Sequence, residues 1–232
     1  MIYASLNNNS PSVTFKDAVI RGLAPDKGLY FPKKIPKLSK SFFNNIESLN
    51  ENEIAYEAIK HYVNFDISKN ELKKIISETL SFNFPIIKIS EKIYSMELYQ
   101  GPTLAFKDVG ARFMARCLGY FNKKERSNKI TVLVATSGDT GGAVADGFLD
   151  VDGINVIILY PSKKVSEIQE KQLTTLGKNI SALEVNGTFD DCQEMVKKSF
   201  LDKDIIKKNK LTSANSITVS YTHLTLPTNR EV

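Results

Sequence analysis

In the second half of the chain, short apolar runs alternate with longer stretches in which apolar residues recur every three or four positions. The short runs predict buried strands, and the longer spacing predicts amphipathic helices. The expected strands are residues 129–135, 155–160 and 180–185, and the expected helices are residues 143–148, 167–176 and 192–200. This alternation predicts an α/β fold with an open, mainly parallel sheet, flanking helices, and ligands at the carboxyl ends of the strands.

The first part of the chain shows a different pattern, with two helical stretches among shorter apolar patches. Apolar residues at helical spacing predict helices over residues 54–62 and 72–80. Asn83-Phe84-Pro85 then ends this region, because proline restricts the residue before it and rarely continues a helix. We therefore expect a smaller N-terminal domain over residues 1–84 and a second domain over residues 85–217.

A lysine lies on a turn between a predicted strand and a predicted helix. Residues 92–99 have the aromatic content of a strand, Gly101-Pro102-Thr103 breaks it, and a helix with apolar residues at helical spacing is expected from Asp108. A lysine held here beside Phe106 would be partly desolvated, which lowers the pKa of the amine and makes it nucleophilic toward an aldehyde. The alternative for Lys107 is an ordinary surface lysine at a helix start.

A glycine-rich loop, Thr136-Ser137-Gly138-Asp139-Thr140-Gly141-Gly142-Ala143, follows the strand expected over residues 129–135. Backbone N–H groups at a helix start favour an anion, glycines allow a close approach, and the Thr and Ser hydroxyls add donors. The loop lacks the Gly-Lys-Ser/Thr of a Walker loop and the dinucleotide fingerprint. We expect it to bind a carboxylate or phosphate; a capping loop without a ligand is the alternative.

The lysine segment, Gly-Pro-Thr-Leu-Ala-Phe-Lys-Asp-Val-Gly-Ala-Arg-Phe over residues 101–113, resembles the cofactor-lysine motif of fold-type II pyridoxal-phosphate enzymes. Among these it is most similar to the longer bacterial threonine synthases. Further segments that resemble the same family are residues 22–32, 160–177, 187–193 and 211–217. The resemblance is colinear from about residue 12 to residue 217, and it departs at Gln100, where the family often has histidine.

The resemblance implies a fold-type II architecture, with an N-terminal domain followed by only the first part of the pyridoxal-phosphate domain, so that the fold is incomplete. It implies that Lys107 bonds covalently to pyridoxal 5'-phosphate, and that Asp139 lies near the ring hydroxyl of this cofactor. The loop that binds the cofactor phosphate and the residue that faces the pyridine nitrogen lie further along the chain in the family. We therefore expect the 232-residue chain to be an inactive fragment.

The resemblance also implies a substrate, O-phospho-L-homoserine, which is converted with water to L-threonine and phosphate by γ-elimination and β-addition. Ser137 and Thr140 would bind the substrate carboxylate, and Asn215 and Ser216 would bind its phosphate. An Asx turn is an equal alternative for the Asn-Ser pair. Two other functions compete: a different fold-type II lyase, such as a threonine dehydratase or phospho-amino-acid lyase, and a non-catalytic remnant.

Residues 218–232 do not continue the family pattern. This threonine-rich segment has no helical period, and we expect an extraneous or disordered tail, with a short C-terminal strand as the alternative.

The composition of the chain excludes several kinds of partner and site. The net charge of +5 comes from scattered lysines without a long basic run, which argues against a nucleic-acid partner. Two well-separated cysteines and two histidines argue against a disulfide framework, a metal site and a Ser-His-Asp triad, and they suit the reducing cytoplasm. The chain opens without the pattern of a signal peptide, and its apolar stretches are far shorter than the ~20 residues of a membrane span. The sequence leaves the oligomeric state open.

Overall fold

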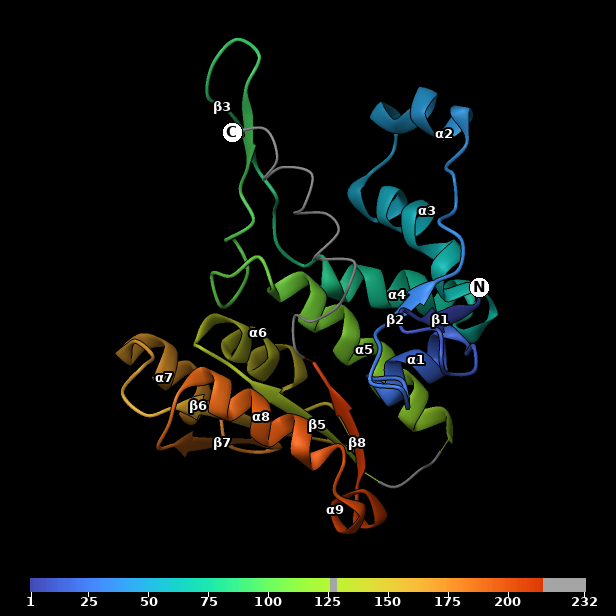
Figure 1. The fold of residues 1–232 in the computed structure, drawn as a ribbon. Helices are drawn as coiled ribbons and strands as arrows, with labels where there is room; N and C mark the ends of the chain where they lie inside the picture. Colours follow the sequence, from blue (N-terminus) through green and yellow to red (C-terminus); the bar gives the residue numbers. More distant parts are fainter. Residues whose placement is uncertain (126–128, 215–232) are drawn as a thin grey trace. The chain divides into compact units, whose positions relative to one another are not determined.

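The computed structural model describes residues 1–125 and 129–214, which form two compact units (Figure 1). The first unit includes Met1–Ser77, and the second begins at Glu78. The expected domain limits, 1–84 and 85–217, remain a prediction. The tail expected over residues 218–232 lies outside the described residues.

The first unit contains a small antiparallel sheet and several short helices. The predicted helices are present as α3 and α4, and α3 begins with a capping box in which Asn50 and Glu53 bond each other's backbone N–H groups. The shorter elements were not predicted, because three to seven residues are too few for a clear period. The elements are β1 (Tyr3–Ser5), α1 (Phe15–Arg21), β2 (Tyr30–Pro32), α2 (Lys40–Asn45), η1 (Ile46–Ser48), α3 (Glu51–Val63), η2 (Asn64–Asp66) and α4 (Lys69–Thr79), which ends in the second unit.

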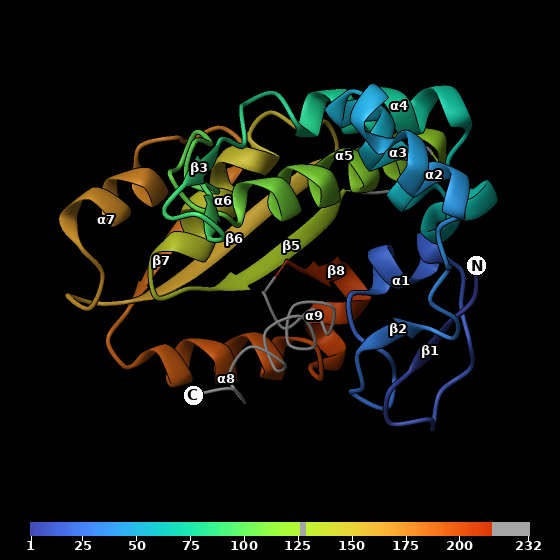
Figure 2. The same cartoon turned by 90° about the horizontal axis from the view of Figure 1, so that it is seen from above.

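The second unit is built on a four-stranded parallel sheet, which confirms the predicted α/β architecture. Its strands lie in the order β7-β6-β5-β8, and every neighbouring pair is parallel. The strands are β5 (Ile130–Ala135), β6 (Ile154–Pro161), β7 (Ile180–Val185) and β8 (Lys210–Ser213); the helices are α5 (Asp108–Glu125), α6 (Asp139–Phe148), α7 (Glu167–Thr174), α8 (Phe189–Ser199) and α9 (Lys203–Lys208). Helices α5 and α6 cover one face of the sheet and α8 the other (Figure 2).

Coverage on both faces explains why all six residues of β5 are buried. On the α8 side, Leu133, Ala135 and Leu159 form a core cluster with Cys192 and Val196. Alternate residues of a strand point to opposite faces, so Val132 and Val134 face the side on which α5 and α6 lie. The sheet is thus held between two apolar layers.

Several boundaries in the second unit differ from the sequence prediction. Helix α6 begins at Asp139 rather than residue 143, because the glycine-rich loop itself turns into helix. Helix α8 begins at Phe189 rather than residue 192, because Thr188 caps it in a capping box with Asp191. The strand expected over residues 92–99 is only β4 (Tyr94–Met96), which pairs with the unpredicted β3 (Ile86–Lys88), and β8 was also unpredicted.

Cys117 and Cys192 are both buried and unpaired, and burial raises the pKa of the Cys117 thiol. Across residues 1–125 and 129–214, every helix is too short or too polar to cross a bilayer.

Two helical glycines test how closely α5 and α6 pack. A Cβ at Gly147 of α6 would lie 3.1 Å from backbone atoms of Ala111 and Arg112 in α5, whereas a Cβ at Gly110 would meet nothing within 4 Å. We expect Gly147→Ala to destabilise the protein by about 1–3 kcal/mol, as overpacking does. Gly110→Ala is the matched control and should stabilise the protein by about 0.5–1 kcal/mol through helix propensity. Urea unfolding of both variants measures this, and equal shifts would contradict the close approach.

Candidate active site

Lys107 and Asp139 lie 32 residues apart in the sequence, and the structure brings their side chains together. The Lys107 Nζ donates a hydrogen bond to Asp139 Oδ2 at 2.9 Å. Lys107 immediately precedes α5 and Asp139 is the first residue of α6, so the N-terminal ends of two neighbouring helices meet at this ion pair. The Lys107 side chain is 19% exposed and that of Asp139 is 46% exposed, so the amine is sheltered without being sealed from solvent.

The ion pair sets the charge of Asp139. Burial alone would raise the pKa of this carboxyl group, but the hydrogen bond and the charge of Lys107 lower it, as does the Thr140 N–H. The net effect is a lowered pKa, so Asp139 is an anion at neutral pH.

The glycine-rich loop is organised by a threonine that the sequence analysis counted as a ligand donor. The Thr136 side chain is buried, and its Oγ1 accepts hydrogen bonds from the N–H groups of Gly138 at 2.9 Å and Gly141 at 2.8 Å. Some of the N–H groups expected to be available for an anion are therefore already bonded within the loop. Ser137 is exposed and Thr140 is half-buried, so these two hydroxyls remain the better candidates for binding a ligand.

Position 138 requires a glycine both because of its backbone conformation and because a neighbouring side chain leaves no room for a Cβ. It has φ +141°, a region that side-chain-bearing residues rarely adopt, and a Cβ there would lie 2.4 Å from the side chain of Gln169 in α7. Helix α7 therefore packs directly on this loop. In the sequence, Gln169 stood out only as part of the resembling segment 160–177, which gave no sign of this contact.

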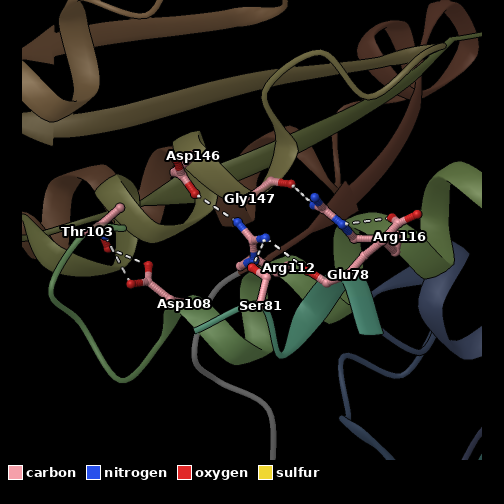
Figure 3. A network of polar contacts seen from close by, with 8 residues as sticks. All are labelled: Glu78, Ser81, Thr103, Asp108, Arg112, Arg116, Asp146 and Gly147. Atoms are coloured by element: carbon pink, nitrogen blue, oxygen red, sulfur yellow. Dashed lines mark hydrogen bonds and ion pairs between the residues drawn. The ribbon is translucent and has the colours of Figure 1, made fainter. Parts of the chain in front are cut away.

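Two arginines of α5 tie it to α6 and to the end of α4, an arrangement that the sequence analysis missed (Figure 3). The Arg112 guanidinium lies 3.5 Å from Asp146 Oδ2 and also donates to the Glu78 carbonyl at 2.9 Å. Arg116 donates to the Gly147 carbonyl at 2.7 Å and lies 3.5 Å from the Glu78 carboxylate. These contacts flank the close approach at Gly147, and they fix α5 against α6 roughly one and a half to two and a half turns beyond the Lys107–Asp139 pair.

Asn215 and Ser216, expected to bind the substrate phosphate, lie outside the described residues. Strand β8, which precedes them, ends at Ser213, where it is paired with Leu133 of β5. The roles expected for the other residues of the site also remain predictions.

Comparison with known proteins identifies the family. Residues 83–223 match the family model for "Pyridoxal-phosphate dependent enzyme", and residues 2–80 match the model for "Threonine synthase N terminus". The chain belongs to the family of pyridoxal-phosphate dependent enzymes.

Curated relatives agree with this assignment. The chain is 45% identical over 217 residues to a threonine synthase of Buchnera aphidicola, and 36% identical over 216 residues to that of Escherichia coli. Each alignment covers 93% of this chain and 50% of the relative. The chain therefore spans about half the length of the curated relatives it matches.

Solved structures show the same architecture. The crystal structure of Escherichia coli threonine synthase matches with a TM-score of 0.86 at 36% identity, covering 95% of this chain and 51% of that one. A pyridoxal-phosphate-bound threonine synthase from Brucella melitensis also matches with a TM-score of 0.86, at 31% identity, covering 100% of this chain and 53% of that one. The fold-type II architecture expected from the sequence, with its N-terminal domain and about half of the full-length fold, is thus confirmed.

The site fits the reactive end of the family's cofactor. Pyridoxal phosphate requires a primary amine that can bond to its aldehyde, and Lys107 presents a sheltered amine beside the loop that follows β5. The neighbouring Asp139 presents an anionic carboxylate 2.9 Å from this amine, which a polar group of the ring would be able to contact. The chemistry of this pair therefore suits the aldehyde side of pyridoxal phosphate.

The ion pair predicts a pH dependence of stability. A carboxyl group whose pKa is lowered by folding stabilises the folded state above its ordinary pKa of 3.8, and this contribution is lost as the pH falls through the folded-state value. We expect the parent chain to lose stability more steeply than Asp139→Asn below pH 3.8, with a constant difference near neutral pH. Urea unfolding at several pH values measures the difference. Parallel curves for the two proteins would contradict the pairing.

Proposed function

We propose that this chain is part of a threonine synthase, which converts O-phospho-L-homoserine and water to L-threonine and phosphate. The observation that carries the proposal is the joining of two features in one chain. A region matching the threonine synthase N terminus precedes a pyridoxal-phosphate enzyme region in which Lys107 and Asp139 lie 2.9 Å apart. The identities of 36–45% to threonine synthases support the same reaction.

Lys107 would have two tasks in this reaction. Its amine would form the covalent bond to the cofactor, and once free it would hold and move protons at Cα of the substrate and further along its chain. Bound pyridoxal phosphate supplies an electron sink for negative charge at Cα. Asp139 would lie near the ring hydroxyl and keep the cofactor end of the site polar.

Substrate binding would use hydroxyl and amide groups. Ser137 and Thr140 would donate hydrogen bonds to the substrate carboxylate, and Asn215 and Ser216 would hold the phosphate. In the overall reaction the Cγ–O bond to phosphate breaks and the water oxygen bonds to Cβ. We also propose a cytoplasmic location, because the two cysteines are buried and unpaired, as a reducing compartment favours.

A polypeptide that joins residues 1–214 to the second half of Escherichia coli threonine synthase tests this function. We expect it to release phosphate from O-phospho-L-homoserine at an ordinary enzyme rate, on the order of 1–10³ per second. The 232-residue chain alone should show no turnover, because it spans about half the length of its relatives. The matched Lys107→Ala chimera should be inactive. The proposal would be contradicted if the Lys107→Ala chimera released phosphate as fast as the parent chimera. It would also be contradicted if the parent chimera deaminated L-threonine and released no phosphate, a result that would favour a threonine dehydratase.

The loop hydroxyls give a separate prediction. In the same chimera, Ser137→Ala and Thr140→Ala should each lower kcat/KM, because a hydrogen bond to a charged group contributes ~1.5–3 kcal/mol, roughly ten- to a hundredfold. Cofactor affinity, measured by absorbance titration, should change much less. Unchanged kcat/KM in both variants would mean that the loop serves only the fold.

A further inference from the structure

The carboxylate next to Lys107 in the sequence is buried and is used by no step of the proposed reaction. Asp108 is 1% exposed, although it begins α5 at the opening of the site. Its oxygens accept two hydrogen bonds from a single residue, from the Thr103 N–H at 3.0 Å and from the Thr103 hydroxyl at 2.5 Å (Figure 3). Burying a charged group is costly unless such bonds are made, so this contact strongly restrains the chain between residues 103 and 108.

The restrained segment is a tight turn that would not hold its shape alone. Leu104 has φ +59°, a left-handed conformation that is unfavourable for a leucine. The residue is 71% exposed, so side-chain packing does little to hold it there. The Leu104 N–H donates to the Gly101 carbonyl at 3.1 Å. A Cβ at Gly101 would lie 2.3 Å from Asp108 Oδ2, so the turn also packs against this carboxylate. Unfavourable backbone of this kind persists only where neighbouring groups enforce it.

The other side of Asp108 is fixed by the helix that it begins. The Ala111 N–H donates to the Lys107 carbonyl, so the backbone of Lys107 is already part of the first turn of α5. Helix α5 is in turn held to α6 by the Arg112 and Arg116 contacts. The turn is thus attached to α5, and α5 to the helix that carries Asp139.

We propose that Asp108 is a positioning residue for Lys107: by binding Thr103 it fixes the turn over residues 101–107 and so holds the lysine amine against Asp139. This inference deepens the proposed function and rests on it for its meaning in catalysis. Asp108 itself contacts neither substrate nor cofactor in this role. It acts on the reaction only through the place and reactivity of the Lys107 amine.

Trace acetylation of the 232-residue chain with acetic anhydride, read by peptide mapping, tests the role without requiring enzyme activity. The measured quantity is the labelling rate of Lys107 relative to that of Lys198, an exposed lysine on α8. In the parent chain, partial burial and the ion pair should make Lys107 the slower of the two. Thr103→Val removes the hydroxyl at nearly constant size, Asp108→Asn removes the charge, and Thr103→Ser keeps the hydroxyl as the conservative control.

We expect the Lys107 to Lys198 ratio to rise roughly tenfold in Thr103→Val and Asp108→Asn, equivalent to ~1.4 kcal/mol of lost protection. Thr103→Ser and Gly110→Ala should keep the parent ratio. General loosening of the second unit would also raise the labelling of Lys210, a half-buried lysine on β8, relative to that of Lys198. Such a joint rise of Lys107 and Lys210 would overturn the proposal. If Asp108→Asn fails to fold, the labelling ratios of Thr103→Val and Thr103→Ser still test the positioning role of Asp108.

The same chains treated with pyridoxal phosphate and borohydride separate this inference from the proposed function. We expect an adduct at Lys107 in the parent chain that is weaker in Thr103→Val and retained in Thr103→Ser. This result would support both the cofactor role of Lys107 and the positioning role of Asp108. An adduct on other lysines in the parent would contradict the cofactor role of Lys107, and the acetylation ratios would still decide the positioning role. Equal ratios in Thr103→Val and Thr103→Ser would overturn it.

Discussion

The close approach of α5 and α6 at Gly147 is the constraint on which the arrangement of the site depends. Without a side chain at this position, the backbone of α6 can lie against that of α5 around Ala111. Both helices begin at the site, α5 directly after Lys107 and α6 at Asp139. Because a helix is stiff, fixing the two helices where they touch also fixes the separation of their first residues. This packing brings the backbones of Lys107 and Asp139 close enough for the 2.9 Å contact between their side chains.

Buried polar groups reinforce the same arrangement. Asp108, Thr136, Arg112 and Asp146 are buried or half-buried, and each makes a hydrogen bond or an ion pair with a neighbouring segment. Burial gives these contacts strength, because water competes poorly for the groups involved. Burial also raises the pKa of Asp146 against the opposing effect of Arg112. The buried polar groups of the second unit therefore stabilise the arrangement of the segments close to the site.

Apolar groups show the opposite behaviour on the β3–β4 hairpin. Ile86, Ile89, Ile93 and Met96 are all exposed, although residues of this kind are usually buried. The sequence analysis extended β4 in both directions and missed β3, because apolar side chains without a core to face give no clear alternation. The curated relatives are about twice as long as the matched region.

The sequence by itself determined the strand–helix alternation of the second unit, the lysine turn and the glycine-rich loop, because periodicity and turn residues are local properties. The resemblance over residues 101–113 indicates the family and Lys107 from the sequence alone. Only the tertiary structure decided that Thr136 organises the loop, that Gln169 packs on Gly138, and that Asp108 closes the turn onto Thr103. These contacts depend on which side chains become buried together. Burial is a property of packing between segments, so the spacing of residues along one segment does not reveal it.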